Sequence, residues 1–308
     1  MRILVTGATG LIGSHLAKKL TDEGNEVVVF YRDIVPSIWY DEALEKCVNV
    51  QGDVRNLGLL KRVLNEYAIE HIYHLAGETI VGRAFRDPIN TFETNIIGTL
   101  NVLEASRQFD VKQILVQNTD KVYGERINAR EDDCLVPMEP YNTSKICQDY
   151  LARSYIETYG MRITLPRSCN VYGYDMSSRI IPNTIRSCLR GNPPVLFTGE
   201  EETVRQYIHV SDVCNAAVFL MGKGWVGPIN VATDDVLTQA QVIKCICKYF
   251  GMREQPVRRQ GSFKQILKQS MDWSKIKALG WKPQITFEDG IKITIEAFKR
   301  YRKDWDSG

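Results

Sequence analysis

The sequence predicts an α/β fold built on a doubly wound parallel sheet, accompanied by a smaller, discontinuous α+β part. Amphipathic, helix-like stretches alternate with short strand-like runs, which lie at residues 2–6, 26–32, 48–54, 71–77 and 113–119. Strands separated by helices indicate right-handed βαβ crossovers, which make the strands parallel. The pattern breaks into shorter pieces past residue 166, so we expect the second part to begin near there.

Composition and charge argue against several classes of partner. The chain has 308 residues, 44% hydrophobic and 25% charged, as in an ordinary globular protein. Its 39 basic and 37 acidic residues leave a net charge of +2, which provides no large field to hold nucleic acid or an anionic membrane. No apolar run reaches the ~20 residues that a membrane-spanning helix needs. We therefore expect neither nucleic acid nor a membrane as a partner.

The cysteines and histidines do not show the spacing of a disulfide framework or a metal site. Eight cysteines without framework spacing, in a chain that opens directly on a strand-like run, predict a reducing, cytoplasmic location. Cys245 and Cys247 stand at i,i+2 in a helical pattern and point to different faces, so we interpret them as buried small side chains. We expect packing or hydrogen-bonding roles, and no metal, for His15, His71, His74 and His209.

A glycine-rich turn follows the first strand. Gly7, Gly10 and Gly13 stand between the strand at 2–6 and an amphipathic stretch that ends near Gly24. In this context glycine lets the backbone press against a pyrophosphate, and the helix N-terminus supplies amide donors and a positive dipole. The turn predicts a Rossmann-type dinucleotide site; the alternative is a glycine-rich turn with no ligand.

The end of the second strand bears on the choice of cofactor. That strand runs into Arg32 and Asp33, where a dinucleotide site contacts the adenosine ribose. Arg32 could stack on adenine and pair with a 2′-phosphate, which favours NADP, whereas Asp33 could accept the 2′-hydroxyl of NAD. Asp53, at the end of the third strand, is placed to reach the adenine amino group. We expect NAD(P), with NADP favoured over NAD.

Catalytic side chains are expected where the strand at 113–119 ends. Residues 118–125 read NTDKVYGE and place Thr119, Asp120 and Lys121 at the carboxyl end of the strand, where parallel sheets bind ligands. Tyr141 and Lys145 follow at i,i+4, on one face of a helix. A phenol with a pKa of ~10 acts as a base near neutrality only if its phenolate is stabilised. Lys145 and a positive nicotinamide ring could do this, while Thr119 bonds the substrate hydroxyl that Tyr141 deprotonates.

Thr119, Tyr141 and Lys145, behind an N-terminal glycine motif, resemble the extended short-chain dehydrogenase/reductase family. The resemblance covers essentially the whole chain and continues in HLAG (74–77), TNIIGT (94–99), RSCNVYG (167–173), RIIP (179–182), RQYIHVSDV (205–213) and LGWKP (279–283). It implies a tightly bound nicotinamide dinucleotide, a nucleotide-sugar substrate and a homodimer formed through a four-helix bundle. The helices expected at 92–109 and 141–159 would form that bundle.

The pair Asp120 and Lys121 is similar to the acid and base of nucleotide-sugar 4,6-dehydratases, and most similar to the CDP-glucose subgroup. By this resemblance Asp120 protonates the leaving C6 hydroxyl and Lys121 takes the C5 proton, once C4 has been oxidised. Lys121 must then be neutral for part of the cycle, which requires its pKa to fall from ~10.4. The alternative is that Lys121 only pairs with Asp120 or binds a substrate oxygen, and no dehydration occurs.

The resemblance also assigns residues to the two ligands. The expected cofactor-binding residues are Gly7, Gly10, Leu11, Ile12, Gly13, Arg32, Asp53, Val54, Leu75, Ala76, Asn95, Tyr141 and Lys145. The expected substrate-binding residues are Thr79, Arg83, Asn170, Arg179 and Arg205. Asn170 and Arg205 match positions that contact the substrate diphosphate in relatives, a task that suits a guanidinium. For Arg83, in a loop after the fourth strand, and for Arg179, a solvated surface arginine is an equal alternative.

We expect residues 1–168 and 207–232 to form the dinucleotide-binding part, and residues 169–206 and 233–308 to hold the nucleotide sugar. Two departures from the family pattern leave the fine shape of the pocket open. Cys169 replaces the usual glycine or phenylalanine, and Gln206 replaces the usual aspartate.

The resulting hypothesis is an NAD(P)-dependent dehydratase that converts an NDP-hexose, of the CDP-glucose or GDP-mannose type, to its 4-keto-6-deoxy derivative. The alternatives are an NDP-sugar 4-epimerase and a non-catalytic protein that senses NAD(P) on the same scaffold.

Overall fold

The computed structural model describes residues 1–35, 42–198, 203–253, 256–260 and 266–306. Its largest element is an eight-stranded sheet in which every pairing is parallel. The strands are β1 (Arg2–Thr6), β2 (Glu26–Tyr31), β3 (Val48–Gln51), β4 (His71–His74), β5 (Gln113–Val116), β6 (Asn118–Thr119), β7 (Ile163–Ser168) and β11 (Gly227–Val231). Their order is β11-β7-β5-β4-β1-β2-β3, with β6 beside β7.

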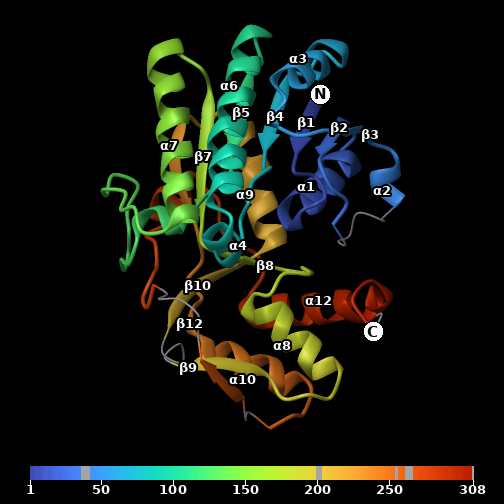
Figure 1. Ribbon diagram of the computed structural model, residues 1–308, viewed down its shortest axis with the longest axis vertical. Helices are drawn as coiled ribbons and strands as arrows, with labels where there is room; N and C mark the ends of the chain where they lie inside the picture. Colours follow the sequence, from blue (N-terminus) through green and yellow to red (C-terminus); the bar gives the residue numbers. More distant parts are fainter. Residues whose placement is uncertain (36–41, 199–202, 254–255, 261–265, 307–308) are drawn as a thin grey trace.

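The predicted doubly wound α/β fold is confirmed. The strand order reverses between β1 and β4, which is the switch point where such sheets bind ligands. Helices cover both faces of the sheet (Figure 1): α3 (Leu57–Glu66), α6 (Gly98–Gln108) and α7 (Pro140–Tyr159) pack on one, and α1 (Leu11–Asp22), α2 (Glu42–Glu45) and α9 (Val210–Lys223) on the other.

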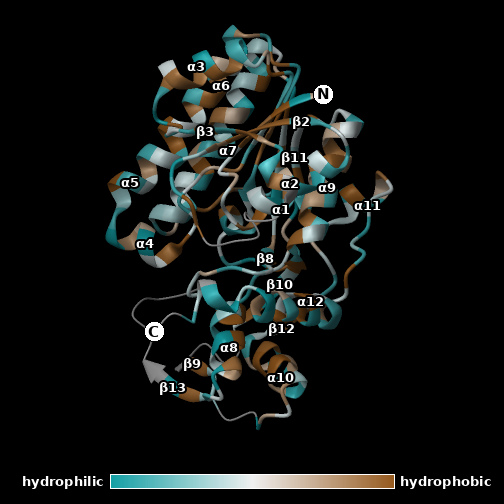
Figure 2. Cartoon of the chain, turned by 90° about the vertical axis from the view of Figure 1, so that its right-hand side faces the viewer, coloured by the Kyte–Doolittle hydropathy of each residue, from teal (hydrophilic) through white to brown (hydrophobic). Residues whose placement is uncertain are grey.

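The alternation of apolar side chains along β1 explains why both faces need a cover. Leu4 packs with the α3, α6 and α7 side, whereas Ile3 and Val5 pack with the α1 and α9 side. All three side chains are buried, so the middle of the strand is apolar on both faces, as expected for a parallel sheet covered on both sides. Figure 2 shows brown, hydrophobic strands in the large sheet, flanked by helices in which teal and brown residues alternate.

A smaller group of elements lies beneath the sheet (Figure 1). β8 (Asn170–Tyr172), β10 (Val204–His209) and β12 (Val236–Thr238) form a three-stranded sheet, and β9 (Val195–Thr198) pairs with β13 (Val257–Gln260). α8 (Ile180–Leu189), α10 (Gln239–Tyr249) and α12 (Phe287–Arg300) share a core that includes Ile185, Ile246 and Ile295. The remaining short helices are α4 (Val81–Arg86), α5 (Pro88–Phe92) and α11 (Ser274–Ala278).

The structure corrects the helix predicted at 92–109. Helical structure begins earlier, with Pro88 at the first position of α5 and the Asp87 carboxylate accepting from the amide of Asn90. A π-helical turn, Glu93–Ile97, then separates α5 from α6. Gly98 follows that turn, and a Cβ there would lie 2.6 Å from Cγ2 of Val54, so the close approach requires glycine.

Several other predicted boundaries also shift. The strands expected at 48–54 and 71–77 end at Gln51 and His74, and the run at 113–119 is divided at Gln117 into β5 and β6. Helix α9 begins at Val210, directly after β10, and His209 caps it by accepting from the amide of Ser211.

None of the helices in the described part of the chain is both long and apolar enough to cross a lipid bilayer. Ile97, beside α6, and Tyr150 and Tyr159, on α7, expose large apolar side chains. The four-helix dimer stays a prediction, which sedimentation of the purified protein would check.

Candidate active site

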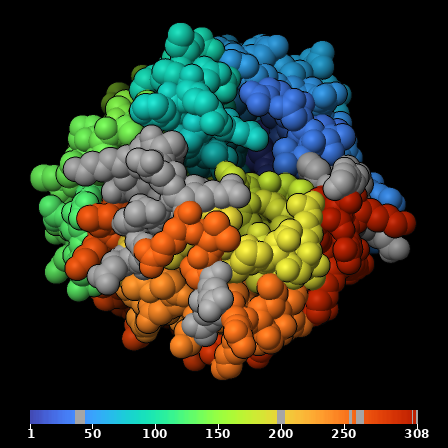
Figure 3. Space-filling view, turned by 60° about the horizontal axis from the view of Figure 1, so that its bottom comes forward, coloured from blue at the N-terminus to red at the C-terminus, as the bar shows by residue number. Residues whose placement is uncertain are grey.

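A cavity of about 880 Å³ opens where the strands of the large sheet end. Its walls combine residues that follow β1, β2, β4 and β6 with residues of β8 and α8 from beneath the sheet. In Figure 3 it appears as a hollow between the blue and teal N-terminal elements and the yellow region of α8. The predicted cofactor-binding and substrate-binding segments therefore share one space.

The glycine turn brings backbone against backbone at the top of this cavity. Gly7 has a φ of +67°, and a Cβ there would lie 2.6 Å from the backbone nitrogen of Ala76. A Cβ on Gly13 would clash with the carbonyl oxygen of Gly7. Gly10 caps α1 without a side chain, and Leu11 and Ile12 of the first turn line the cavity. Only bare backbone fits here, which suits the close approach of a phosphate to a helix N-terminus.

The end of the cavity beside β2 and β3 carries opposite charges. The Arg32 Nε donates to the Asp33 carboxylate at 2.6 Å, and both side chains are exposed. Asp53 also lines the cavity, beside Val54, and is held by Arg55 at 2.7 Å between Nη2 and Oδ2. The structure brings Arg32, Asp53 and Val54 to one end, and Arg32 is already paired.

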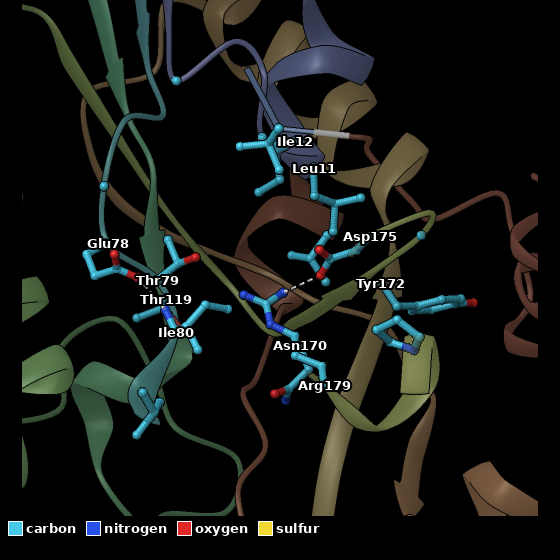
Figure 4. Close-up of a pocket in the computed structure, with 18 of the residues that line it drawn as sticks. Leu11, Ile12, Glu78, Thr79, Ile80, Thr119, Asn170, Tyr172, Asp175 and Arg179 are labelled. Atoms are coloured by element: carbon cyan, nitrogen blue, oxygen red, sulfur yellow. Dashed lines mark hydrogen bonds and ion pairs between the residues drawn. The ribbon is translucent and has the colours of Figure 1, made fainter. Parts of the chain in front are cut away.

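Asn95 lies behind the cavity wall rather than on it. Its side chain is buried, donates to the carbonyl of Glu78 at 3.0 Å and accepts from the Glu78 amide at 2.8 Å. It also donates to Ser144 Oγ on α7 at 2.8 Å. Asn95 thus fixes the loop after β4 and ties it to α7. Leu75, Ala76 and Thr79 of that loop do line the cavity, as does Thr119; both threonines are labelled in Figure 4.

Tyr141 and Lys145 both face the cavity from the first turns of α7. This helix begins after Glu139, whose carboxylate accepts from the amides of Tyr141 and Asn142 at 2.8 and 2.7 Å. Lys145 Nζ donates to the backbone carbonyl of Gln117 at 2.7 Å, which ties the helix to the end of β5. The expected i,i+4 arrangement is therefore present at the cavity wall.

Burial shifts the pKa of both side chains toward the neutral form. Desolvation raises the pKa of the Tyr141 phenol to about 12, although Arg179 and a hydrogen bond with Thr119 act in the opposite direction. Desolvation lowers the pKa of Lys145 to about 7, opposed by Asp149. A phenolate at Tyr141 consequently needs an additional positive charge in the cavity, and an oxidised nicotinamide would supply one.

Thr119, Asp120 and Lys121 form a connected hydrogen-bonded group. Thr119 Oγ1 donates to Asp120 Oδ1 at 3.0 Å, and Lys121 Nζ donates to the same oxygen at 2.9 Å. Asp120 is almost fully buried and the Lys121 side chain is 17% exposed. Desolvation lowers the pKa of Lys121, with Asp120 opposing the shift. The pKa moves in the direction that a base requires.

Lys121 has two further partners, one of which the sequence did not indicate. Asn170 Oδ1, on β8, accepts from Lys121 Nζ at 3.2 Å, as does Oε1 of Gln269 at 2.7 Å. Gln269 is fully buried and stands 148 residues away in the chain. No spacing or motif links such distant positions, so only the three-dimensional structure reveals the contact.

The expected substrate residues differ in placement. Asn170, Arg179 and Arg205 line the cavity. Arg179 directly precedes α8, and its Nη1 lies 3.9 Å from Oδ2 of Asp175. Figure 4 marks this ion pair with a dashed line. Arg205 donates to the carbonyls of Val204, Ile266 and Leu267, so its guanidinium is held by backbone.

Arg83 does not reach the cavity. The sequence predicts a loop there, but residues 81–86 form α4, with Ala84 buried and Arg83 exposed. The cavity is lined instead by its neighbours Val81 and Gly82. The helical turn carries the arginine side chain to the solvent face.

Residues 3–232 match the model of the NAD dependent epimerase/dehydratase family. The chain belongs to that family. A dTDP-glucose 4,6-dehydratase of Xanthomonas campestris is 30% identical over 322 residues, covering 95% of this chain and 92% of the relative. A putative UDP-glucose 4-epimerase of Methanocaldococcus jannaschii is 28% identical, covering 96% and 98%.

Solved structures of the family show the same division. A dTDP-glucose 4,6-dehydratase of Streptomyces venezuelae, crystallised with NAD, has a TM-score of 0.92 and 29% identity, covering 99% of each chain. A UDP-glucose 4-epimerase of Thermotoga maritima, crystallised with UDP-glucose, has a TM-score of 0.90 and 29% identity, covering 97% of this chain and 99% of that one. The family and fold are thereby shown, and relatives of both activities are equally similar.

Proposed function

We propose that this protein is an NAD(P)-dependent nucleotide-sugar 4,6-dehydratase acting on an NDP-hexose of the CDP-glucose or GDP-mannose type. The observation that carries the proposal is that a second acid–base pair, Asp120 and Lys121, shares the cavity with Tyr141. Oxidation and reduction at one carbon need a single base. Removal of water across C5 and C6 needs a further base and a further acid, and this pair can supply both.

Tyr141, Lys145 and Thr119 are proposed to act at C4. Thr119 bonds the C4 hydroxyl and Tyr141 accepts its proton, while Lys145 stabilises the phenolate from the next turn of α7. A bound nicotinamide would supply the hydride acceptor for C4 and the hydride donor for C6. The glycine turn, with Leu11, Ile12, Val54, Leu75 and Ala76, would hold the dinucleotide.

Asp120 and Lys121 are proposed to remove water. The reaction needs a protonated Asp120 and a neutral Lys121, and the ion pair holds the same number of protons as that combination. Moving one proton along the 2.9 Å hydrogen bond from Lys121 Nζ to Asp120 Oδ1 creates both forms at once. Lys121 then takes the C5 proton, Asp120 protonates the C6 hydroxyl, and water leaves. The pair is then carboxylate and ammonium, and the ammonium, after exchange with solvent, gives a proton to C5 when hydride reaches C6. Release of the C4 proton from Tyr141 and uptake of one proton by Lys121 restore the starting state.

Arg32 is proposed to raise the affinity for NADP relative to NAD, and Asp33 is proposed to reduce this effect. Asp33 occupies the guanidinium and would repel a 2′-phosphate. Asp33→Asn is therefore expected to tighten NADP relative to NAD by about 1.5-fold to fivefold, the range for an exposed ion pair. Calorimetric titration with both cofactors measures this ratio, with Asp22→Asn on α1 as the control. An unchanged ratio would show that Arg32 does not contact the ribose.

Product analysis tests the proposed reaction directly. A thermal-shift panel of CDP-, GDP-, UDP- and dTDP-hexoses first identifies the nucleotide, and the stabilising compounds are then incubated with the protein. The expected product has lost one water by mass, and in deuterated water it carries solvent deuterium at C5. A product of unchanged mass with C4 inverted identifies a 4-epimerase instead, as the epimerase relatives allow. Binding without any product indicates an NAD(P)-sensing protein.

A further inference from the structure

Gln269 contacts Lys121 from within the protein interior. It is fully buried and is not among the described residues that line the cavity, whereas Lys121, Asp120 and Asn170 are. Its Oε1 accepts from Lys121 Nζ at 2.7 Å, a shorter hydrogen bond than those from the same amine to Asp120 at 2.9 Å and Asn170 at 3.2 Å. A buried contact behind a reactive amine constrains the direction in which the amine can act.

The orientation of the Gln269 amide is fixed by its own neighbours. Its Nε2 donates to the backbone carbonyls of Asp120 at 2.8 Å and Gly124 at 3.0 Å. Both acceptors are carbonyl oxygens, so the nitrogen must face them and the oxygen must face Lys121. The amide therefore always presents an acceptor to Lys121 and cannot present a donor without losing two hydrogen bonds.

The segment that carries Gln269 is tied down on both sides. The backbone N–H of Gln269 donates to the backbone carbonyl of Val204 at 3.2 Å. The backbone N–H of Ser270 donates to the backbone carbonyl of Arg126 at 3.0 Å. Gln206 fastens the same segment through Met271, accepting from its amide at 2.8 Å and donating to its carbonyl at 3.2 Å. Gln269 lies outside the residues 3–232 that match the family model.

The three partners of Lys121 account for each proton of an ammonium. After one proton moves to Asp120, the neutral amine keeps two N–H groups and gains a lone pair. The lone pair first faces Asp120, which has received the proton, and the two N–H groups face Gln269 and Asn170. A rotation of one third of a turn about the Cε–Nζ bond keeps an N–H group on Gln269 and turns the lone pair to the Asn170 side, which lines the cavity.

On the basis of the proposed dehydration, we propose that Gln269 is a positioning residue for Lys121: it holds the amine from behind, aims its lone pair at the C5 proton, and sets how the shared proton is divided with Asp120. Other titratable or charged groups that act on Lys121 or feel its charge are Arg205, on β10, Cys169, beside β8, and Glu139, at the start of α7. None of these is altered by a substitution at residue 269.

The test compares two substitutions that change the acceptor in opposite ways. Asp120 and Lys121 can remove water only while one proton is shared between them. That proton is lost as pH rises through the Lys121 pKa, so the dehydration rate falls there. Gln269→Glu adds a negative charge, raises that pKa and moves the basic limb of the kcat profile to higher pH. It also draws the proton toward Lys121, so the plateau rate falls about tenfold for each unit of the shift.

Gln269→Met has a similar length but offers no comparable acceptor, so the Lys121 pKa falls and the basic limb moves to lower pH. Its kcat is expected to fall about 10- to 100-fold, because the amine loses the contact that aims it. Gln206→Met is the matched control, since it loosens the same segment without touching Lys121, and its basic limb should not move.

A second readout does not depend on turnover. Acetylation of Lys121 by acetic anhydride requires the neutral amine, and peptide mass spectrometry follows its pH dependence in the same variants. One outcome is that the pH profile of Lys121 acetylation shifts in the Gln269 variants but the wild-type protein catalyses no dehydration. This would overturn the proposed function, whereas the effect of Gln269 on Lys121 would stand. Dehydration by the wild-type protein, with neither the basic limb nor the acetylation profile moved in the Gln269 variants, would overturn the inference.

Discussion

Replacing Tyr141 with phenylalanine is expected to lower kcat for the proposed dehydration by about 10²- to 10⁴-fold, with little change in nucleotide-sugar affinity. The phenol is buried at the cavity wall, one helical turn from Lys145. Phenylalanine fills almost the same volume but cannot accept the C4 proton, so the loss should appear in kcat rather than in binding. Initial rates of product formation and calorimetric titration of the nucleotide sugar measure the two effects.

Tyr150→Phe provides a matched control, because Tyr150 lies on the same helix and is 54% exposed. Since the phenolate is the reactive form, acid pH should slow the wild-type protein as the phenolate is lost, and the residual rate of Tyr141→Phe should lack this dependence. Equal rates in Tyr141→Phe and the wild-type protein would mean that another group takes the C4 proton.

The regular parts of the fold were predictable because each rests on a local pattern. The run at residues 2–6 forms β1 as expected, because β-branched and apolar side chains suit a strand covered on both faces. The π-helical turn at Glu93–Ile97 was not predictable. Such turns are rare interruptions of α-helices, and no residue type at these positions distinguishes a π-helical turn from an ordinary helical one.

Some positions in the candidate site could likewise be predicted from local patterns, and others could not. Tyr141 and Lys145 could be placed together because i,i+4 spacing on a helix fixes which face they share. The positions of Asn95, behind the wall, and Arg83, on the solvent face of α4, depend on how the loop after β4 folds. The contact between Gln269 and Lys121 depends on a chain reversal over 148 residues, which no local pattern encodes.

The helix that carries Tyr141 and Lys145 is anchored by a buried ion pair between β7 and α7. Arg167 is fully buried, and its Nε and Nη2 donate to the two oxygens of Asp149, each at 2.9 Å. Its Nη1 donates to the hydroxyl of Tyr123 at 2.7 Å. Asp149 also accepts from Asn118 Nδ2 at 3.1 Å, one residue before Thr119. The Arg167–Asp149 ion pair therefore holds α7 against the strand end where the reactive side chains lie.

Arg167→Met is expected to reduce the free energy of unfolding by about 3–5 kcal/mol, because it leaves the buried Asp149 carboxylate without its charged partner. Arg153→Met is the control: Arg153 lies 3.8 Å from the same carboxylate but is 43% exposed, so its loss should cost less than about 1 kcal/mol. Urea unfolding measures both, and equal losses would contradict an anchoring role. The double variant Arg167→Met, Asp149→Leu should recover part of the loss, since removing both charges leaves neither unpaired.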